Sequence, residues 1–280
     1  MTAVDRTRHP VLIAAFEGWN DAGDAASGAL DHLVEVWDAR QVAELDPDDY
    51  YDFQVNRPTV RTVDGDARQV SWPTTRFYLA RPPGSDHDVV LARGIEPNMR
   101  WRGFTAAVLK IAEELGVRTV VTLGALLADS PHTRPVPVTG TTSDPDERER
   151  LALSPSRYEG PTGIVGVLQD AAQRSGLPAV SLWAAVPHYV AQPPCPKATV
   201  ALLHRVEDIL DVAVELSDLP QRAREWEAQV DELAADDTDV AEYVASLEQR
   251  ETEPGLSDLP EASGDAIARD FERYLRRRGD

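Results

Sequence analysis

The sequence predicts an α/β protein: a three-layer α/β/α sandwich followed by an acidic helical segment at the C-terminal end. Short apolar runs typical of buried strands alternate with amphipathic helical patterns from about Val4 to Leu216. After Ser217 the sequence becomes acidic and only helical periodicity remains. We therefore divide the chain into a core domain, residues 1–216, and an acidic helical C-terminal segment, residues 217–280.

The first predicted elements form a β-α-β unit. Val11–Phe16 is an unbroken apolar run, which is typical of a strand that is buried on both faces. A helix is predicted next, with Asp21 or Asp24 as a cap and an apolar stripe that runs from Ala25 to Trp37. Arg40–Leu45 is the second predicted strand, which we expect to run parallel to the first.

The middle of the core alternates between further strands and helices. The predicted strands are Thr59–Val63, Gln69–Trp72 and Arg76–Leu79, which are short and antiparallel with a tight turn at Asp64-Gly65, followed by Val89–Ala92, Val117–Leu123 and Ala179–Val186. The predicted helices follow Pro97, with Gly116 as C-cap, then Gly163, and then the loop Pro187–Pro196. Ser130–Pro145 is rich in Pro, Thr, Ser and Asp and is predicted to be a long loop.

The C-terminal segment carries three short helical stripes on an acidic background. The stripes are Trp226/Val230/Leu233, Val240/Tyr243/Val244/Leu247 and Ile267/Phe271/Tyr274. Residues 217–280 contain 18 acidic and 8 basic residues, so half of the net charge of −20 lies there. Helices this short are marginal alone in water, so we expect them to pack on the core domain or on another subunit.

Charge and cysteine content exclude several classes of partner. A net charge of −20 disfavours nucleic acid and repels anionic membrane surfaces. The single cysteine, Cys195, excludes an internal disulfide and fits the reducing cytoplasm. Met1–His9 lacks the apolar region of a signal peptide, and we find no run long enough to span a membrane.

The strongest local feature is the glycine-bearing segment Glu17–Asp24 between a strand and a helix. Parallel α/β folds often bind ligands at such a junction. The segment lacks the lysine of a phosphate loop and the spacing of a dinucleotide fingerprint, so we favour a structural turn and cap over ligand contact. Glu17, Asp21 and Asp24 could also hold a divalent cation, but helix N-termini favour carboxylates without any metal.

A second candidate is the basic group Arg100, Trp101 and Arg102 at the next strand-to-helix junction. These guanidinium groups could clamp a carboxylate or phosphate, or they could pair with surplus acids or with a neighbouring subunit. We favour pairing because the chain is so acidic.

Catalytic signatures are weak throughout. Asp129-Ser130-Pro131-His132 contains triad residue types, but adjacent residues rarely converge as a triad and the chain has no G-x-S-x-G elbow. The histidines and Cys195 lack zinc spacing. We expect no cofactor, no metal and no catalytic residues.

Five stretches together resemble the bacterial branch of the proteasome assembly chaperone two family. They are Gly18–Ala26, Gly94–Trp101, Leu123–Pro135, Tyr158–Ile164 and Ala185–Tyr189. The resemblance implies a sandwich similar to nucleoside phosphorylases and peptidyl-hydrolase-like folds, an oligomer, and a proteasome-related protein partner. Family members that dock on proteasomes often end in a hydrophobic-Tyr-any tripeptide, whereas this sequence ends in Arg277-Arg278-Gly279-Asp280.

We expect a non-enzymatic homo-oligomer, a trimer, that acts as a protein-binding scaffold or chaperone. The alternative is an enzyme that binds a small ligand or nucleotide in the crevice at the carboxyl ends of the strands. The candidate crevice or interface residues are Glu17, Asn20, Asp21, Arg100, Trp101, Gly160 and Thr162. An enzyme should gather them around a deep pocket, whereas a scaffold should use them at an interface.

Overall fold

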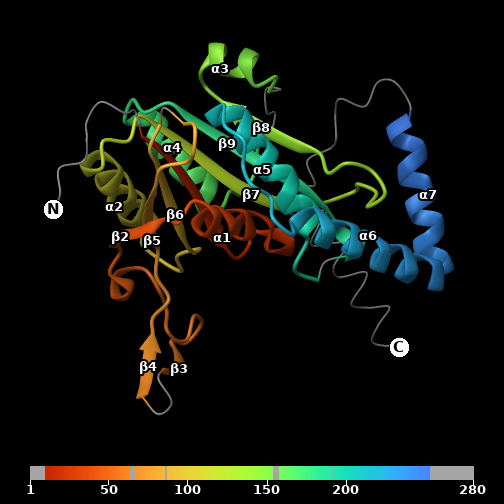
Figure 1. Cartoon of the computed structure of the whole chain (residues 1–280), viewed down its shortest axis with the longest axis horizontal. Helices are drawn as coiled ribbons and strands as arrows, with labels where there is room; N and C mark the ends of the chain where they lie inside the picture. Colours follow the sequence, from red (N-terminus) through yellow and green to blue (C-terminus); the bar gives the residue numbers. More distant parts are fainter. Residues whose placement is uncertain (1–9, 64–66, 86, 154–157, 191, 253–280) are drawn as a thin grey trace.

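The computed structural model describes residues 10–63, 67–85, 87–153, 158–190 and 192–252. Its centre is a seven-stranded mixed sheet of order β2-β5-β6-β1-β7-β9-β8 (Figure 1). The strands are β1 (Val11–Glu17), β2 (Arg40–Glu44), β5 (Arg76–Ala80), β6 (Val89–Ile95), β7 (Thr119–Ala128), β8 (Val138–Thr142) and β9 (Ala179–Pro187). The four central strands, β6, β1, β7 and β9, are parallel, while β5 and β8 flank them in the antiparallel sense.

Helices cover both faces of the sheet, which confirms the predicted three-layer sandwich. One face is covered by α1 (Ala25–Val36), α5 (Pro196–Leu210) and α6 (Leu219–Asp236), and the other by α2 (Trp101–Glu114) and α4 (Ile164–Arg174). Strand β1 contributes side chains to both apolar layers, because Ile13 belongs to the first core cluster and Leu12 to the second. Burial on both faces is why this strand is apolar without alternation.

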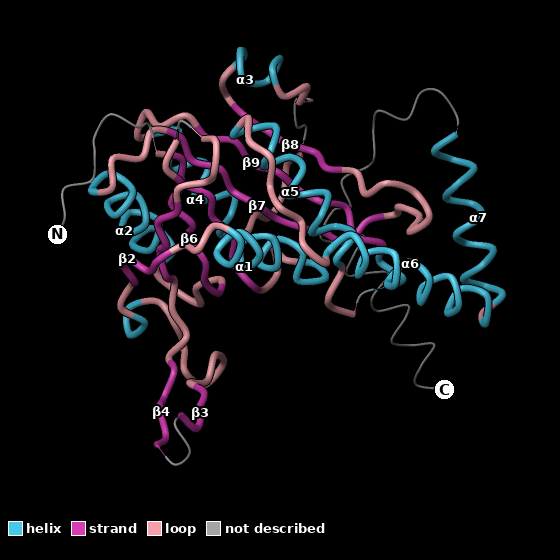
Figure 2. The backbone as a smooth tube through the Cα atoms, viewed as in Figure 1, coloured by secondary structure: helices cyan, strands magenta, loops and turns pink. Residues whose placement is uncertain are grey.

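The smaller elements lie around this frame. They are the helices α3 (Pro145–Arg150) and α7 (Thr238–Thr252), the 3-10 turns η1 (Ala22–Asp24), η2 (Pro47–Asp49) and η3 (His188–Val190), and the strands β3 (Thr59–Val63) and β4 (Ala67–Ser71). β3 and β4 form a separate antiparallel hairpin, as predicted, which extends away from the sandwich (Figure 2). The predicted turn at Asp64-Gly65 lies outside the described residues.

The opening β-α-β unit was predicted wrongly in one respect. Strand β2 runs in the same direction as β1, as predicted, because it is antiparallel to β5, which is antiparallel to β6. It does not lie beside β1, however, since β6 and β5 separate them and β2 is at the edge of the sheet. Four of its five residues are exposed. Its polar sequence, with Arg40, Gln41 and Glu44, suits an edge strand rather than the interior of a parallel sheet.

The predicted loop Ser130–Pro145 contains a strand, β8, which pairs antiparallel with β9. Threonines and a central glycine concealed it, because glycine is unfavourable in most strands. Gly140 is required there, since a Cβ atom would lie 2.8 Å from side-chain carbons of both Leu153 and Leu182.

The helices after Ser217 pack on their own chain. Leu219, Trp226 and Val230 of α6 are buried in the core cluster with α5. Leu233, predicted to share this stripe, is instead 65% exposed, and Ala234 is buried. The domain boundary at Leu216 stays a prediction, and the third stripe lies outside the described residues.

Polar contacts also attach these helices to the core domain. His132 Nε2 lies 3.0 Å from Asp231 Oδ1 of α6, and its Nδ1 lies 2.7 Å from the hydroxyl of Tyr189. Tyr243 of α7 contacts the rings of His188 and Tyr189 edge to face. Within the part of the chain that the structure describes, no helix combines the length and apolar character needed to cross a membrane.

Candidate functional site

Three of the sequence motifs meet at the carboxyl ends of the central parallel strands. The segment after β1 contacts the segment after β6, because the amide of Glu96 donates to the carbonyl of Glu17 over 2.8 Å. It also contacts β7, where the amide of Ala125 donates to the carbonyl of Asn20 over 2.8 Å. The third motif enters through Gly163 and the start of α4.

The Glu96 carboxylate links all three segments. Its Oε1 atom accepts hydrogen bonds from Asn20 Nδ2 at 2.6 Å and from the amide of Ile164 at 2.9 Å. Ile164 is the first residue of α4, and its N-cap, Gly163, has no side chain with which to cap the helix. A carboxylate from residue 96 therefore caps a helix that begins 68 residues later, where the helix dipole favours negative charge.

Gly163 is required by lack of space rather than by backbone conformation. Its φ is −92°, which any residue adopts, but a Cβ atom there would lie 1.9 Å from Asn20 Oδ1. Asn20 is only 3% exposed and has no room to withdraw. The pair Asn20–Gly163 thus explains why the first and third motifs need these residue types.

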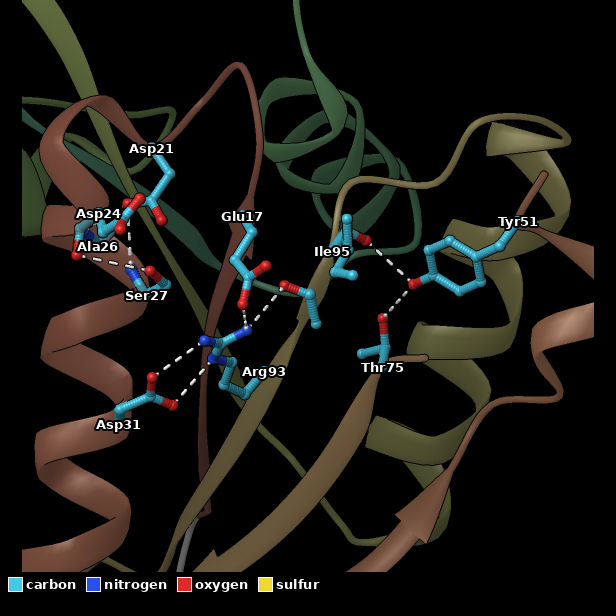
Figure 3. Close-up of polar contacts among 11 residues, drawn as sticks. Glu17, Asp21, Asp24, Ala26, Ser27, Asp31, Tyr51, Thr75, Arg93 and Ile95 are labelled. Carbon is cyan, nitrogen blue, oxygen red and sulfur yellow. Dashed lines mark hydrogen bonds and ion pairs between the residues drawn. The ribbon is translucent and has the colours of Figure 1, made fainter. Parts of the chain in front are cut away.

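Asp21 caps helix α1, as the sequence predicted for Asp21 or Asp24 (Figure 3). Its Oδ1 accepts from the amides of Ala26 at 2.7 Å and Ser27 at 3.1 Å. Its Oδ2 is buried and has no hydrogen-bond partner among the described residues. Burial therefore raises the pKa of Asp21, although the bonds from Ser27 and Ala26 act in the opposite direction.

Arg93, which the sequence analysis missed, neutralises the other carboxylates of this region (Figure 3). Its Nε and Nη2 atoms donate to Asp31 at 2.9 Å each, and its Nη1 donates to Glu17. Burial alone would lower the pKa of Arg93, but the bonds and charges of Asp31 and Glu17 outweigh burial and raise it. The signal was available: Arg93 is the one charged residue in the buried strand Val89–Ile95.

A cavity of about 640 Å³ lies beside this ion-pair group, between α1, β6 and the starts of α5 and α6. Its lining is strongly polar and includes Glu17, Asp24, Asp31, Arg93 and Asp218. Of the seven candidate residues, Glu17 alone lines it. The other candidates do not converge on this cavity.

The remaining candidates lie toward the outside of the motif segments. Arg100 pairs with Asp49 of its own chain, and Trp101 Nε1 donates to the carbonyl of Pro97 over 2.6 Å. Gly160 and Thr162 are exposed. Pairing of Arg100 with a surplus acid agrees with the interpretation favoured from the sequence.

The weaker catalytic candidates, Ser130, His132 and Cys195, are buried and make contacts within the fold. Ser130 Oγ is 3.4 Å from the carbonyl of Ala185, and His132 contacts Tyr189 and Asp231. Cys195 is buried, which raises its pKa to about 11 and disfavours the thiolate. Among the described residues, no group of three or more histidine, cysteine or acidic side chains is arranged to hold a metal ion.

Comparison with known proteins now identifies this arrangement. The model of the PAC2 family matches residues 15–234, which is most of the chain. The chain belongs to the PAC2 family. The motif segments Gly18–Ala26, Gly94–Trp101 and Tyr158–Ile164 all lie within the matched residues. We call the edge where they meet, joined through Asn20, Glu96 and Gly163, the motif edge.

Solved structures agree with this membership. A PAC2 family protein from Streptomyces avermitilis is 60% identical, covering 84% of this chain and 99% of its own, with a TM-score of 0.79. The Mycobacterium tuberculosis proteasome-assembly chaperone homologue Rv2125 is 57% identical, with the same coverage and a TM-score of 0.77. PbaB, an archaeal proteasome activator from Pyrococcus furiosus, is 20% identical over 81% of this chain and 93% of its own, and its TM-score of 0.64 shows a shared fold. A search of curated proteins found no match.

The PAC2 motif segments also present exposed apolar side chains. Trp19, between the buried Asn20 and the Glu17–Arg93 ion pair, is 68% exposed. Met99, in the segment after β6, is 42% exposed. Exposed tryptophan and methionine on a rigid segment are typical of protein-contact surfaces.

We predict that Glu96→Ala destabilises the protein by roughly 1–3 kcal/mol, because it removes the acceptor for Asn20 and for the amide of Ile164. Chemical denaturation measures this loss as a fall in the free energy of unfolding. Glu96→Gln is the matched control, since its amide oxygen can accept both bonds. Equal stability of Glu96→Ala and the wild type would show that the carboxylate does not link the segments.

We predict that Asp21→Asn gains stability relative to the wild type as pH rises from the ordinary carboxyl pKa of 3.8 towards neutrality. The folded-state pKa of Asp21 is raised above its ordinary 3.8, so the folded wild type binds this proton more tightly than the unfolded chain does. Its stability therefore falls as pH rises through that window, whereas asparagine keeps the cap and has no proton to lose. Urea unfolding of both proteins across the window measures the difference, and a difference independent of pH would contradict the burial of a charged Asp21.

Proposed function

We propose that this protein is a non-enzymatic, homo-oligomeric scaffold with a chaperone-like role, and that its motif edge binds another protein. The observation that carries the proposal is the close packing of the motif edge together with the exposed apolar side chains on it. Asn20, Glu96 and Gly163 fill one another's space, while Trp19 and Met99 face outward. Such a preorganised surface binds a partner at a low entropic cost.

The alternative, an enzyme that binds a small ligand or nucleotide in the strand-end crevice, has less support. The cavity beside the edge is lined by several carboxylates, which repel phosphate. Two arginines also line it: the partly buried Arg93 is already paired with Asp31 and Glu17, and Arg222 is exposed. The exposed candidates Arg100 and Thr162 do not line it.

The partner we propose is proteasome-related, and the location cytoplasmic. Support for the partner comes from the names of the relatives, a proteasome-assembly chaperone homologue and an archaeal proteasome activator. The motif edge is the surface we assign to this contact. The oligomer we propose is a trimer of the 30.7 kDa chain.

We predict that Trp19→Ala weakens binding to a proteasome purified from the native cytosol by tenfold or more, because exposed tryptophans often dominate contact energy. Biolayer interferometry with immobilised full-length protein measures the dissociation constant. Val42→Ala removes an exposed apolar residue from edge strand β2 and serves as the matched control. If the wild type itself does not bind, the proteasome-related partner is wrong, and mass spectrometry after affinity purification identifies another.

We predict that magnesium-ATP leaves the melting temperature unchanged and that no ATP hydrolysis exceeds background. A nucleotide present at a hundredfold its dissociation constant would stabilise the fold by about 2.7 kcal/mol, which differential scanning fluorimetry detects. Magnesium chloride alone is the control. A rise that depends on ATP would favour the enzyme alternative.

A further inference from the structure

The hairpin β3–β4 stands apart from the rest of the molecule. Figures 1 and 2 show it extending beyond β2 and β5, away from the sandwich. All residues of β3 and all but the last of β4 are exposed. An isolated two-stranded hairpin is only marginally stable in water, so a covering surface would stabilise it.

One face of the hairpin is apolar. Val60 and Val70 are direct cross-strand partners, and they are 53% and 48% exposed. Trp72, two residues beyond Val70, is 45% exposed and packs edge to face on Phe53 at 4.9 Å between ring centroids. The side chain of Arg68 lies on the same face because it is two residues before Val70. The face therefore combines two valines and a tryptophan with one cation.

Residues 53–72 carry a net charge of +1, because they contain three arginines and two aspartates, whereas the whole chain is strongly acidic. Arg57, Arg61 and Arg68 occur in residues 53–63 and 67–72, which contain no acidic residue. The two aspartates of the connection, Asp64 and Asp66, lie outside the described residues. The whole chain carries a net charge of −20, so a second copy offers an oppositely charged surface.

A complementary surface lies at the C-terminal end of α6. Leu233 is 65% exposed there, although it was expected to be buried. The exposed acidic residues Glu232, Asp236 and Asp237 are close to Leu233 in sequence. Asp236 and Asp237 follow Leu233 by three and four positions, which is the spacing of neighbours on a helix surface. This α6 patch, consisting of Leu233, Glu232, Asp236 and Asp237, pairs an apolar centre with an acidic rim.

We propose that the hairpin of one copy binds the α6 patch of the next copy, with Val60, Val70 and Trp72 against Leu233 and Arg68 against Asp236 and Asp237. The proposal rests on the homo-oligomer proposed above. Figure 1 places the hairpin and the end of α6 in opposite parts of the molecule, so the contact joins two chains. Because it joins two different surfaces, it is a head-to-tail contact, which gives a closed ring such as the proposed trimer when the rotation between successive copies closes, and an open filament when it does not.

Light scattering after size-exclusion chromatography of the full chain tests this contact. Arg68→Glu and Val70→Lys are each expected to convert the oligomer to a monomer. Arg118→Glu, at an exposed residue directly before β7, makes the same charge change away from the hairpin and is expected to leave the oligomer intact. Circular dichroism melting curves verify that each variant remains folded.

A charge-reversed chain distinguishes direct pairing from general repulsion. Arg68→Glu combined with Asp236→Lys and Asp237→Lys is expected to recover the oligomer, because each contact again joins opposite charges. A monomeric wild type would overturn the proposed oligomer itself. An oligomeric wild type whose mass is unchanged by Arg68→Glu and Val70→Lys, or a charge-reversed chain that stays monomeric, would overturn only this pairing.

Discussion

The Glu96 carboxylate is the contact on which the motif edge depends. One oxygen atom accepts from the side chain of Asn20 and from the amide of Ile164, and so joins segments that are 76 and 68 residues away along the chain. The first turn of a helix leaves amides unpaired, and a glycine at the N-cap cannot satisfy them. Here the cap comes from another strand end, so the position of α4 is tied to that of β6. The absence of a side chain at Gly163 is part of the same arrangement, since it makes room for Asn20.

This arrangement leaves few of the motif carboxylates available for chemistry. Asp21 is committed to the amides at the start of α1, and Glu17 is paired with Arg93. Glu17 and one oxygen of Asp21 are thus held by the fold, while the buried Oδ2 atom of Asp21 has no hydrogen-bond partner among the described residues. Trp19 and Met99 lie outside this network, and their side chains are apolar and exposed. Exposed side chains of this kind are typical of surfaces that contact a protein.

Sequence periodicity could predict the elements that are buried on both sides, and it was weakest where an element has few neighbours. β1 was predictable because every residue from Val11 to Phe16 is buried. β8 was not predictable, because Gly140 is in close contact with the side chains of Leu153 and Leu182. Such contacts between distant residues are not visible in a local sequence pattern. The motifs could be placed at strand ends, but the bonds that join Asn20 to Glu96 depend on strand order. Leu233 shows the same limit, because it is exposed although it belongs to the predicted stripe. A helical stripe predicts which face of a helix is buried, but not how far along the helix that face remains packed against other elements.

The charge distribution constrains how copies of this chain can associate. Each carries a net charge of −20, and residues 217–280 alone contribute −10, so random contacts between copies are repulsive. A cationic element therefore favours specific association, and two arginines near the motif edge, Arg93 and Arg100, already pair within their own chain. The hairpin is the projecting part of the described structure that combines arginine with exposed apolar side chains. The base of the hairpin adjoins the motif edge, because the amide of Asp52 and Nδ2 of Asn56 both donate to Asn98 Oδ1, and the amide of Met99 donates to the carbonyl of Tyr50. Self-association through the hairpin and partner binding at the motif edge would therefore use neighbouring surfaces.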